Sequence, residues 1–380
     1  MSLRRTVFWI HLAVGVSAAA VVLVMAVTGV LLTYEAQFNR WALREYSAEP
    51  HLQGGAQLTV DELISRVSDV RGAGKVSSVV LKKDSREPAV VRLEDGATVY
   101  VDRHTGEFLG DGNTRMRRFL RSVMYVHRWF GLQGEYRIIG RTLTATANLG
   151  FLFLVLSGVY LWWPSTHSRA AWRQVLWFRR GLSGRARNFN WHSVIGFWSA
   201  VPLAVIIASG TTISYRWAGN LVYRLAGEAP PAQTSGQQPE PVARDDPAVP
   251  TDPAHPTAEL QAIAARAIVE TPDWKTVTVR LPVAAGDPVS VGIDRGTGRQ
   301  PSKTEDLLFN RATGELVGRA GYPAFSRGQK IRRWLRFAHT GEVYGVFGQS
   351  IAGVVSLGVA VMVWTGLAMS WRRFFGSRKP

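Results

Sequence analysis

Four long apolar runs constrain this chain more than any other feature. They cover residues 8–34, 137–163, 191–215 and 344–371. About 20 consecutive apolar residues in a helix are enough to cross the hydrocarbon core of a bilayer. The first run exceeds the roughly 7–15 apolar residues of a signal peptide, so we expect it to stay as an uncleaved helix. The sequence therefore predicts a membrane α-helical bundle with four transmembrane helices.

The distribution of basic residues predicts the orientation of these helices. The loop 164–190 contains six arginines and no acid, and further basic residues flank the first helix and fill the tail 372–380. By the positive-inside rule these segments and both termini lie in the cytoplasm. The long stretches between the helices then face outward, into the periplasm of a bacterium whose inner membrane holds the protein. The net charge of +17 is thus a signal of topology, and we expect a lipid bilayer and no nucleic acid as partner.

Each outward stretch contains the pattern of a soluble α+β module. In module 1, residues 35–114, we predict a helix at 58–70, strands at 76–82, 89–93 and 98–102, and a turn at Thr105-Gly106. In module 2, residues 257–329, we predict a helix at 257–270, strands at 276–281, 289–293 and 307–310, and a turn at Thr313-Gly314. The remaining outward segments are two basic amphipathic interfacial segments, 115–136 and 330–343, and a linker, 216–256, that is rich in proline from residue 229.

The two halves of the chain repeat. His11 precedes Thr28-Gly29 by 17 residues, and His192 precedes Ser209-Gly210 by the same 17. Two further matches share one offset of 208 residues: Asp102-Arg103-x-Thr105-Gly106-Glu107 against Asn310-Arg311-x-Thr313-Gly314-Glu315, and Ser157-Gly158 against Thr365-Gly366. The chain is therefore interpreted as a duplicated two-helix unit, helix–module–helix, with a pseudo-twofold axis along the membrane normal.

Four of the eight histidines lie in or beside the apolar runs. His11 and His192, the inner pair, are expected near the cytoplasmic ends of their helices, and His127 and His339, the outer pair, just outside the other two. An ionisable residue at membrane depth is costly and points to function. Two imidazoles facing each other in a bundle suit the axial positions of haem iron. The alternative is that they are buried and hydrogen bond across helices. The other four are expected in solvent: His51, His104, His167 and His255.

Residues around these histidines fit the same hypothesis. Gly15 and Gly196 each follow a histidine by four residues, on the same helix face, and would leave space for a flat macrocycle. Arg118 and Arg333 could pair with haem propionates or another anionic ligand, or they could anchor interfacial helices at lipid headgroups. The outer pair is separated by 212 residues instead of 208, so its equivalence requires an insertion of about one helical turn.

The absence of cysteine excludes several classes of redox site. A chain without Cys has no disulfide, Cys-ligated zinc, iron–sulfur cluster or covalently attached haem c. It also lacks H-E-x-x-H, G-x-S-x-G, Walker and G-x-G-x-x-G motifs, so we assign no catalytic side chain and expect no nucleotide cofactor. An electron donor would be a cytoplasmic protein or a membrane quinol.

These motifs, in this order, resemble the PepSY-associated transmembrane helix family. The resemblance covers nearly the whole chain except the linker, and within the family it is greatest to the inner-membrane ferrisiderophore (ferrioxamine B) reductases. It implies two periplasmic PepSY-like modules and two non-covalent haem b groups per chain. It also implies that the haem iron is bound by His11, His127, His192 and His339.

The leading hypothesis is an enzyme, a ferric-chelate reductase. It would move electrons from the cytoplasmic side to a periplasmic ferric siderophore, a hydroxamate such as ferrioxamine. Reduction to Fe(II) would release the metal, because hard oxygen ligands hold Fe(III) more tightly. Two alternatives remain: a haem-free membrane protein that binds a siderophore or peptide and assists a transporter, and a transporter that moves metal ions through its histidines.

Overall fold

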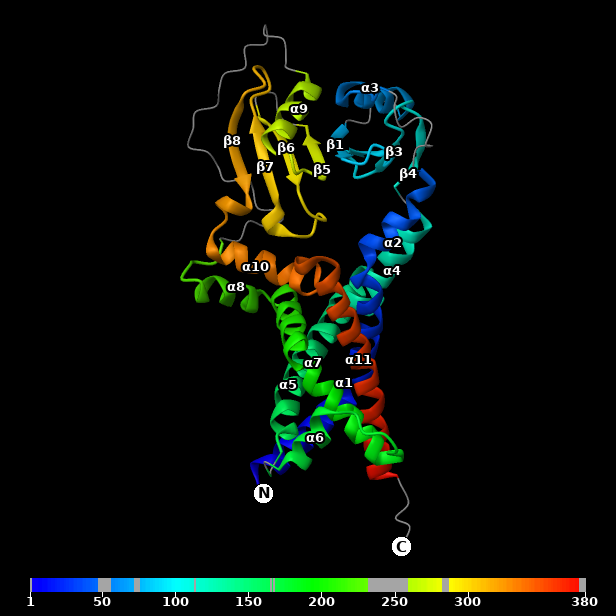
Figure 1. Ribbon diagram of the computed structural model, residues 1–380, viewed down its shortest axis with the longest axis vertical. Helices are drawn as coiled ribbons and strands as arrows, with labels where there is room; N and C mark the ends of the chain where they lie inside the picture. Colours follow the sequence, from blue (N-terminus) through cyan, green and yellow to red (C-terminus); the bar gives the residue numbers. More distant parts are fainter. Residues whose placement is uncertain are drawn as a thin grey trace. The chain divides into compact units, whose positions relative to one another are not determined.

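The computed structural model describes residues 2–46, 56–71, 76–112, 114–164, 166, 168–231, 259–281 and 287–375. The chain forms two compact units, each assembled from separate parts of the sequence. Unit 1 comprises Met1–Glu35, Phe119–Ala229 and Arg327–Pro380, and unit 2 comprises Ala36–Arg118 and Pro230–Ser326. Figure 1 labels their helices and strands.

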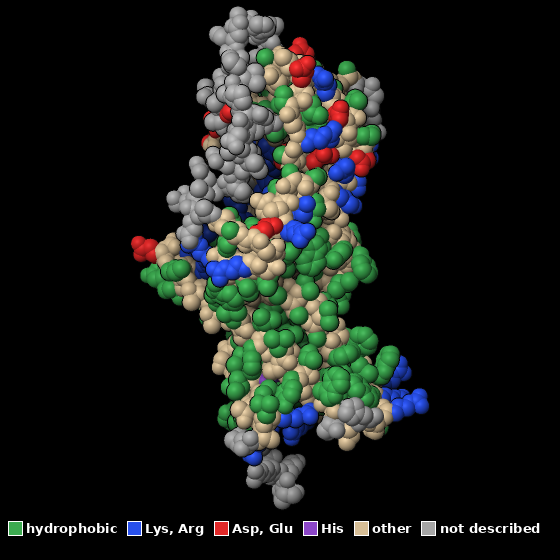
Figure 2. Space-filling model, turned by 90° about the vertical axis from the view of Figure 1, so that its left-hand side faces the viewer, with side chains coloured by type: hydrophobic (Ala, Val, Ile, Leu, Met, Phe, Trp, Pro, Cys, Tyr) green, Lys and Arg blue, Asp and Glu red, His purple; other side chains and the backbone are tan. Residues whose placement is uncertain are grey.

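Unit 1 is a bundle of four long helices that correspond to the four predicted spans. They are α1 (Leu3–Thr33), α5 (Arg137–Trp162), α7 (Gly184–Ser214) and α11 (Gly345–Phe374). α1 and α7 each pack against both α5 and α11, so α1 and α7 occupy opposite corners of the bundle. Figure 2 shows apolar side chains covering the middle of these helices, with Lys and Arg at either end. This distribution is typical of helices that cross a bilayer.

Shorter helices lie at the two ends of the bundle (Figure 1). α6 (Arg169–Leu176) packs on α7 at one end, and α8 (Arg216–Leu225) packs on α10 (Arg327–Ala338) at the other end. The predicted loop 164–190 thus contains α6, and the predicted linker 216–256 contains α8. Each helix is too short to show a clear apolar period in the sequence. The predicted interfacial segments contain α4 (Arg115–Trp129) and α10, followed by the 3₁₀ turns η3 (Gly134–Tyr136) and η6 (Glu342–Tyr344).

Unit 2 is built on one antiparallel sheet. After α2 (Glu35–Ala42) and η1 (Arg44–Tyr46), the first half contributes α3 (Val60–Arg71), β1 (Val76–Lys82), β2 (Ala89–Leu93), β3 (Thr98–Val101) and β4 (Phe108–Asp111). The second half contributes α9 (Leu260–Glu270), β5 (Thr276–Arg280), β6 (Val289–Asp294), β7 (Thr304–Phe309) and β8 (Leu316–Gly321), with the 3₁₀ turns η4 (Pro301–Lys303) and η5 (Tyr322–Ala324).

The two predicted modules share this sheet instead of forming separate domains. The strand order is β4-β3-β2-β1-β5-β6-β7-β8, and β1 pairs with β5 through positions such as Val79 opposite Val279. The repeated Thr-Gly-Glu motif forms a tight turn before the last strand of each half, as predicted. The Asp102 carboxylate accepts from the backbone N–H groups of His104 and Thr105 at 2.7 and 2.9 Å, and Gly106 has a φ of 74°.

A single apolar core joins the two halves. α3 and α9 contribute to one cluster of buried side chains together with both sets of strands. The two helices also cap each other: the Asp61 carboxylate accepts from the N–H groups of Leu260 and Gln261, at 3.2 and 2.9 Å, and the Gln261 side chain accepts from the N–H of Val60 at 3.0 Å. Neither helix start is complete without the other, because the first N–H groups of a helix lack partners within it.

Replacing Ile263 with alanine tests this shared core. The side chain is fully buried in α9, and its truncation is expected to destabilise unit 2 by about 2–5 kcal/mol. Denaturant unfolding followed by limited proteolysis would report which half opens. We expect residues 56–112 and 259–321 to lose protection together, whereas loss of protection confined to the second half would contradict a common core.

Candidate functional site

Each of the four described histidines of unit 1 faces a serine or threonine followed by glycine on a neighbouring helix. His11 on α1 is the first example: its Nδ1 lies 2.8 Å from the hydroxyl of Ser157 on α5. A Cβ at the next residue, Gly158, would lie 3.5 Å from the Cε1 atom of the ring. The ring therefore rests against bare backbone while its Nδ1 makes a hydrogen bond. We call this arrangement a Ser/Thr-Gly notch.

The other three histidines occupy equivalent notches. The distance from Nδ1 to the hydroxyl oxygen is 2.9 Å for His127 and Thr28, 3.1 Å for His192 and Thr365, and 3.2 Å for His339 and Ser209. The following glycines again face the rings: a Cβ at Gly29, Gly366 or Gly210 would lie 3.5, 3.5 or 3.1 Å from the Cε1 atom. All four histidines are thus held in one way, at both ends of the bundle.

The hydrogen bonds of the hydroxyl groups assign the tautomer of each ring. Every notch hydroxyl donates to a carbonyl of its own helix: Ser157 to Phe153, Thr28 to Val24, Ser209 to Ile206 and Thr365 to Val361, at 2.6–2.8 Å. A hydroxyl has a single hydrogen to donate, so it accepts a hydrogen bond from the histidine. Nδ1 therefore carries the proton, and in the neutral ring Nε2 has a free lone pair. This is the form in which histidine binds a metal.

Backbone groups also support three of the rings, among them that of His127, which forms a hydrogen bond with the backbone of Met25. His192 Nδ1 also lies 3.1 Å from the carbonyl oxygen of Met362, and His339 Nδ1 lies 2.8 Å from that of Ile206. A carbonyl oxygen only accepts, which supports the same tautomer. Among the described residues, the hydroxyl of Ser157 is the one hydrogen-bond partner of the His11 ring. In the inner pair, the His11 ring therefore has one hydrogen-bond partner, whereas the His192 ring has two.

The outer pair has a spacing that suits one metal ion between two rings. The ring centroids of His127 and His339 are 6.3 Å apart, with an angle of 64° between the rings. Two imidazoles on opposite sides of one metal have centroids roughly 6 Å apart, since a metal–imidazole bond is about 2 Å. The inner pair comes from opposite corners of the bundle, His11 from α1 and His192 from α7.

The donor set fits haem better than a bare metal ion. Within the described part of the chain, no group of three or more His, Asp or Glu side chains could hold a metal. Two imidazoles leave a zinc or ferrous ion short of ligands, whereas the porphyrin of a haem supplies the other four and needs two axial ligands. The pairs therefore have the right number and kind of ligands for bis-histidine haem.

The bundle between the two pairs is apolar. In each half, 17 residues separate the first histidine from the glycine-linked hydroxyl of the outer notch, which is about 25 Å along a helix. Buried apolar side chains occupy this interval on three helices: Val22, Ala26, Leu203, Ile207, Val355 and Val359. The buried Ser199 and Asn148 are polar exceptions in this part of the bundle. Among the described residues of this interval no side chain is acidic or basic, which disfavours a path for cations from one pair to the other.

The glycines that touch the imidazole rings differ from Gly15 and Gly196, which are predicted to leave space for a macrocycle. A Cβ at Gly15 would meet Leu154 at 3.8 Å, and one at Gly196 would meet the sulfur of Met362 at 3.5 Å, so either position has room for a methyl group. The sequence contained the signal for the real contacts, since the four notches coincide with the repeated Ser/Thr-Gly pairs. From the sequence alone that repeat indicates only a duplicated unit, and no role is assigned to its hydroxyls.

The two predicted arginines lie farther along the short helices, with exposed side chains. Arg118 precedes His127 by nine residues and Arg333 precedes His339 by six, which is about 13 and 9 Å along the helix axis.

His104, which was predicted to lie in solvent, is only partly exposed, because its Nδ1 is buried without a described partner. His51, His167 and His255 lie outside the described residues.

A cluster of arginines not singled out from the sequence lies beside the outer pair. Arg128 directly follows His127, and its guanidinium and that of Arg137 lie 4.9 and 3.9 Å from the ring centroid of Trp129. Burial lowers the pKa of Arg128, and the nearby positive charges of Arg336, Arg137 and Arg141 lower it further. Such a concentration of positive charge favours an anionic group at this end of the bundle.

Comparison with known proteins identifies one family. The family described as PepSY-associated TM region matches residues 8–373, which includes the four long helices, all four histidines and both halves of the sheet. No curated protein matches the chain.

Proposed function

Since the chain belongs to the PepSY-associated TM family, we propose that it is a dihaem b protein that reduces ferric chelates. The observation that carries the proposal is the fourfold notch. Four imidazoles are arranged as two pairs, and the Nδ1 of each forms a hydrogen bond with a serine or threonine hydroxyl on a neighbouring helix. In the neutral ring this leaves Nε2 to bind iron. In this proposal His11 and His192 bind one haem, and His127 and His339 bind the other. Bound haem would supply one-electron redox chemistry.

In this proposal the protein's own residues orient the histidine rings, keep water out of the bundle and pair with anionic groups. The notch hydroxyls keep the Nδ1 protons in place and orient the rings, which also strengthens their binding to metal. The apolar cluster between the pairs excludes water and ions from the bundle. The Arg128, Arg137, Arg141 and Arg336 guanidinium groups would pair with carboxylates at the outer site.

The proposal includes a membrane orientation. The basic loop and both ends of the chain lie in the cytoplasm of a bacterium, by the positive-inside rule, and the sheet of unit 2 lies in the periplasm. The common order of elements in the two halves supports a duplicated two-helix unit. Each ferric ion takes up one electron and is released as Fe(II), because oxygen ligands hold the ferrous ion less tightly. The donor is a cytoplasmic reductant or a quinol, and a quinol would reduce two ferric ions and lose two protons.

An absorption spectrum of the detergent-purified protein tests the proposal. We expect a Soret band, sharp α and β bands after dithionite, and about two haem b per chain in a pyridine haemochrome assay. Addition of a ferric chelate to the reduced protein should reoxidise it, and a ferrous-specific chelator should then trap Fe(II). Colourless protein from haem-replete cells would reject the proposal and favour the haem-free binding function.

A further inference from the structure

Unit 2 contains a pocket that is separate from the histidine pairs. It is lined by α2 and η1 on one side and by the loop between β1 and β2 on the other, and its volume is about 400 Å³. This volume lies within the range of pockets that bind small molecules. The lining residues are Arg40, Leu43, Arg44, Asp84, Arg86, Glu87 and Pro88.

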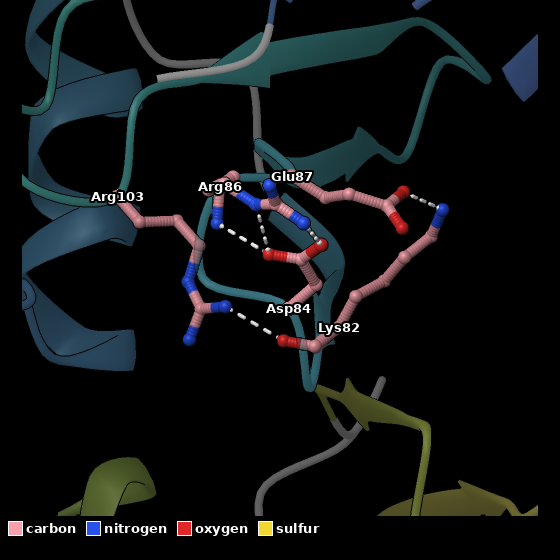
Figure 3. Close-up of polar contacts among 5 residues, drawn as sticks. All are labelled: Lys82, Asp84, Arg86, Glu87 and Arg103. Carbon is pink, nitrogen blue, oxygen red and sulfur yellow. Dashed lines mark hydrogen bonds and ion pairs between the residues drawn. The ribbon is translucent and has the colours of Figure 1, made fainter. Parts of the chain in front are cut away.

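The acidic residues of the pocket are already paired. Both oxygens of Asp84 accept from the Arg86 side chain, at 3.0 and 2.7 Å, and Glu87 forms an ion pair with Lys82 (Figure 3). The hydrogen bond from Arg86 lowers the pKa of Asp84, so this carboxylate stays charged. Its charge is balanced by Arg86 within the same loop.

Arg103 also holds the loop between β1 and β2 in place. The buried Arg103 donates to the carbonyl oxygen of Lys82 at 2.7 Å (Figure 3) and to the side chain of Gln57 at 2.5 Å. These bonds hold the end of β1 in place, so this wall of the pocket is preformed.

The opposite wall carries positive charge without a balancing acid. Arg40 and Arg44 are exposed, and no described side chain forms a hydrogen bond or ion pair with either guanidinium. They are four residues apart, and like charges at this spacing repel each other. With Asp84 and Glu87 balanced by Arg86 and Lys82, the pocket keeps an excess of two positive charges next to the apolar surfaces of Leu43 and Pro88. An anion with some apolar surface would complement both features.

We infer that this pocket binds a ferric chelate of net negative charge, with catecholate or carboxylate ligands, before its reduction. The inference rests on the proposed function and defines its substrate class. Paired guanidinium groups bind carboxylate and phenolate oxygens through charge-assisted hydrogen bonds. A tris-hydroxamate chelate, the class suggested by the family resemblance, has its ligand charge balanced by Fe(III) and would gain little from Arg40 and Arg44.

The test uses binding without electron transfer. Gallium(III) replaces Fe(III) in such chelates but is not reduced, so titration of the full-length protein with the gallium complex of a tris-catecholate siderophore measures affinity alone. We expect Arg40→Gln/Arg44→Gln to weaken binding at least tenfold, because it removes both unbalanced charges. Arg169→Gln/Arg173→Gln is the matched control: it removes two exposed arginines at the same spacing from α6, in unit 1, and affinity should change less than twofold.

The outcomes separate this inference from the proposed function. Failure of the tris-catecholate complex to bind, equal affinity of the double variant and the unmodified protein, or equal affinity for gallium desferrioxamine would each overturn the inference. None of these results depends on haem. Conversely, arginine-dependent binding by a protein that contains no haem would support the pocket and reject the reductase.

Discussion

Replacing His192 with alanine is expected to remove one of two haems, so that the purified protein contains about one haem b per chain. In this proposal the imidazole of His192 would hold the iron of the inner haem, and alanine offers no atom in its place. His339→Ala should have the same stoichiometric effect at the outer site, because its ring lies 6.3 Å from that of His127. Reduction of ferric chelate should fall at least a hundredfold in both variants.

A redox titration distinguishes the two variants and makes each the control for the other. The unmodified protein should show two haem potentials, and each variant should keep a different one of them. A His11→Ala/His192→Ala double variant should lose no more haem than His192→Ala, since both residues bind the same group. If His192→Ala and His339→Ala both retained two haems, the histidine pairs would not be the binding sites.

The fold was predictable wherever a pattern is local. The four apolar runs predict α1, α5, α7 and α11, and apolar β-branched residues give β1 and β2 the predicted bounds. β4 and β8 were missed because they are short or contain glycine, which weakens a strand pattern. The pairing of β1 with β5 joins positions about 200 residues apart, and neither strand carries a local signal for its partner.

The candidate site, like the fold, was predictable from the sequence only where its pattern is local. A histidine in an apolar run is rare enough to be noticed, and the repeat placed four of them in pairs. Ser157-Gly158 and Thr365-Gly366 were also visible, but small residues are common where membrane helices pack closely. Their second role, as hydrogen-bond partner and ring platform, depends on which helices are neighbours. That order, with α1 and α7 at opposite corners, comes only from the folded bundle.

Removing the Ser157 hydroxyl should have a much larger effect than removing the Thr365 hydroxyl. Ser157→Ala leaves His11 Nδ1 without its hydrogen-bond partner, so the ring can rotate and protonate on either nitrogen. Loss of such a partner typically weakens metal binding 10–100-fold. In Thr365→Val, which keeps the size of the side chain, His192 can still donate to the carbonyl oxygen of Met362. We therefore expect a small change in that variant.

Haem retention during dilution or competition with apomyoglobin measures the difference directly. Ser157→Ala should lose the inner haem at least tenfold faster than the unmodified protein, while Thr365→Val stays within about threefold and both keep the outer haem. This asymmetry follows from the backbone carbonyl, since both hydroxyls occupy equivalent notches. Equal loss in the two variants would mean that the carbonyl bond contributes nothing. Unchanged retention in both would show that the hydroxyls pack against the rings without orienting them.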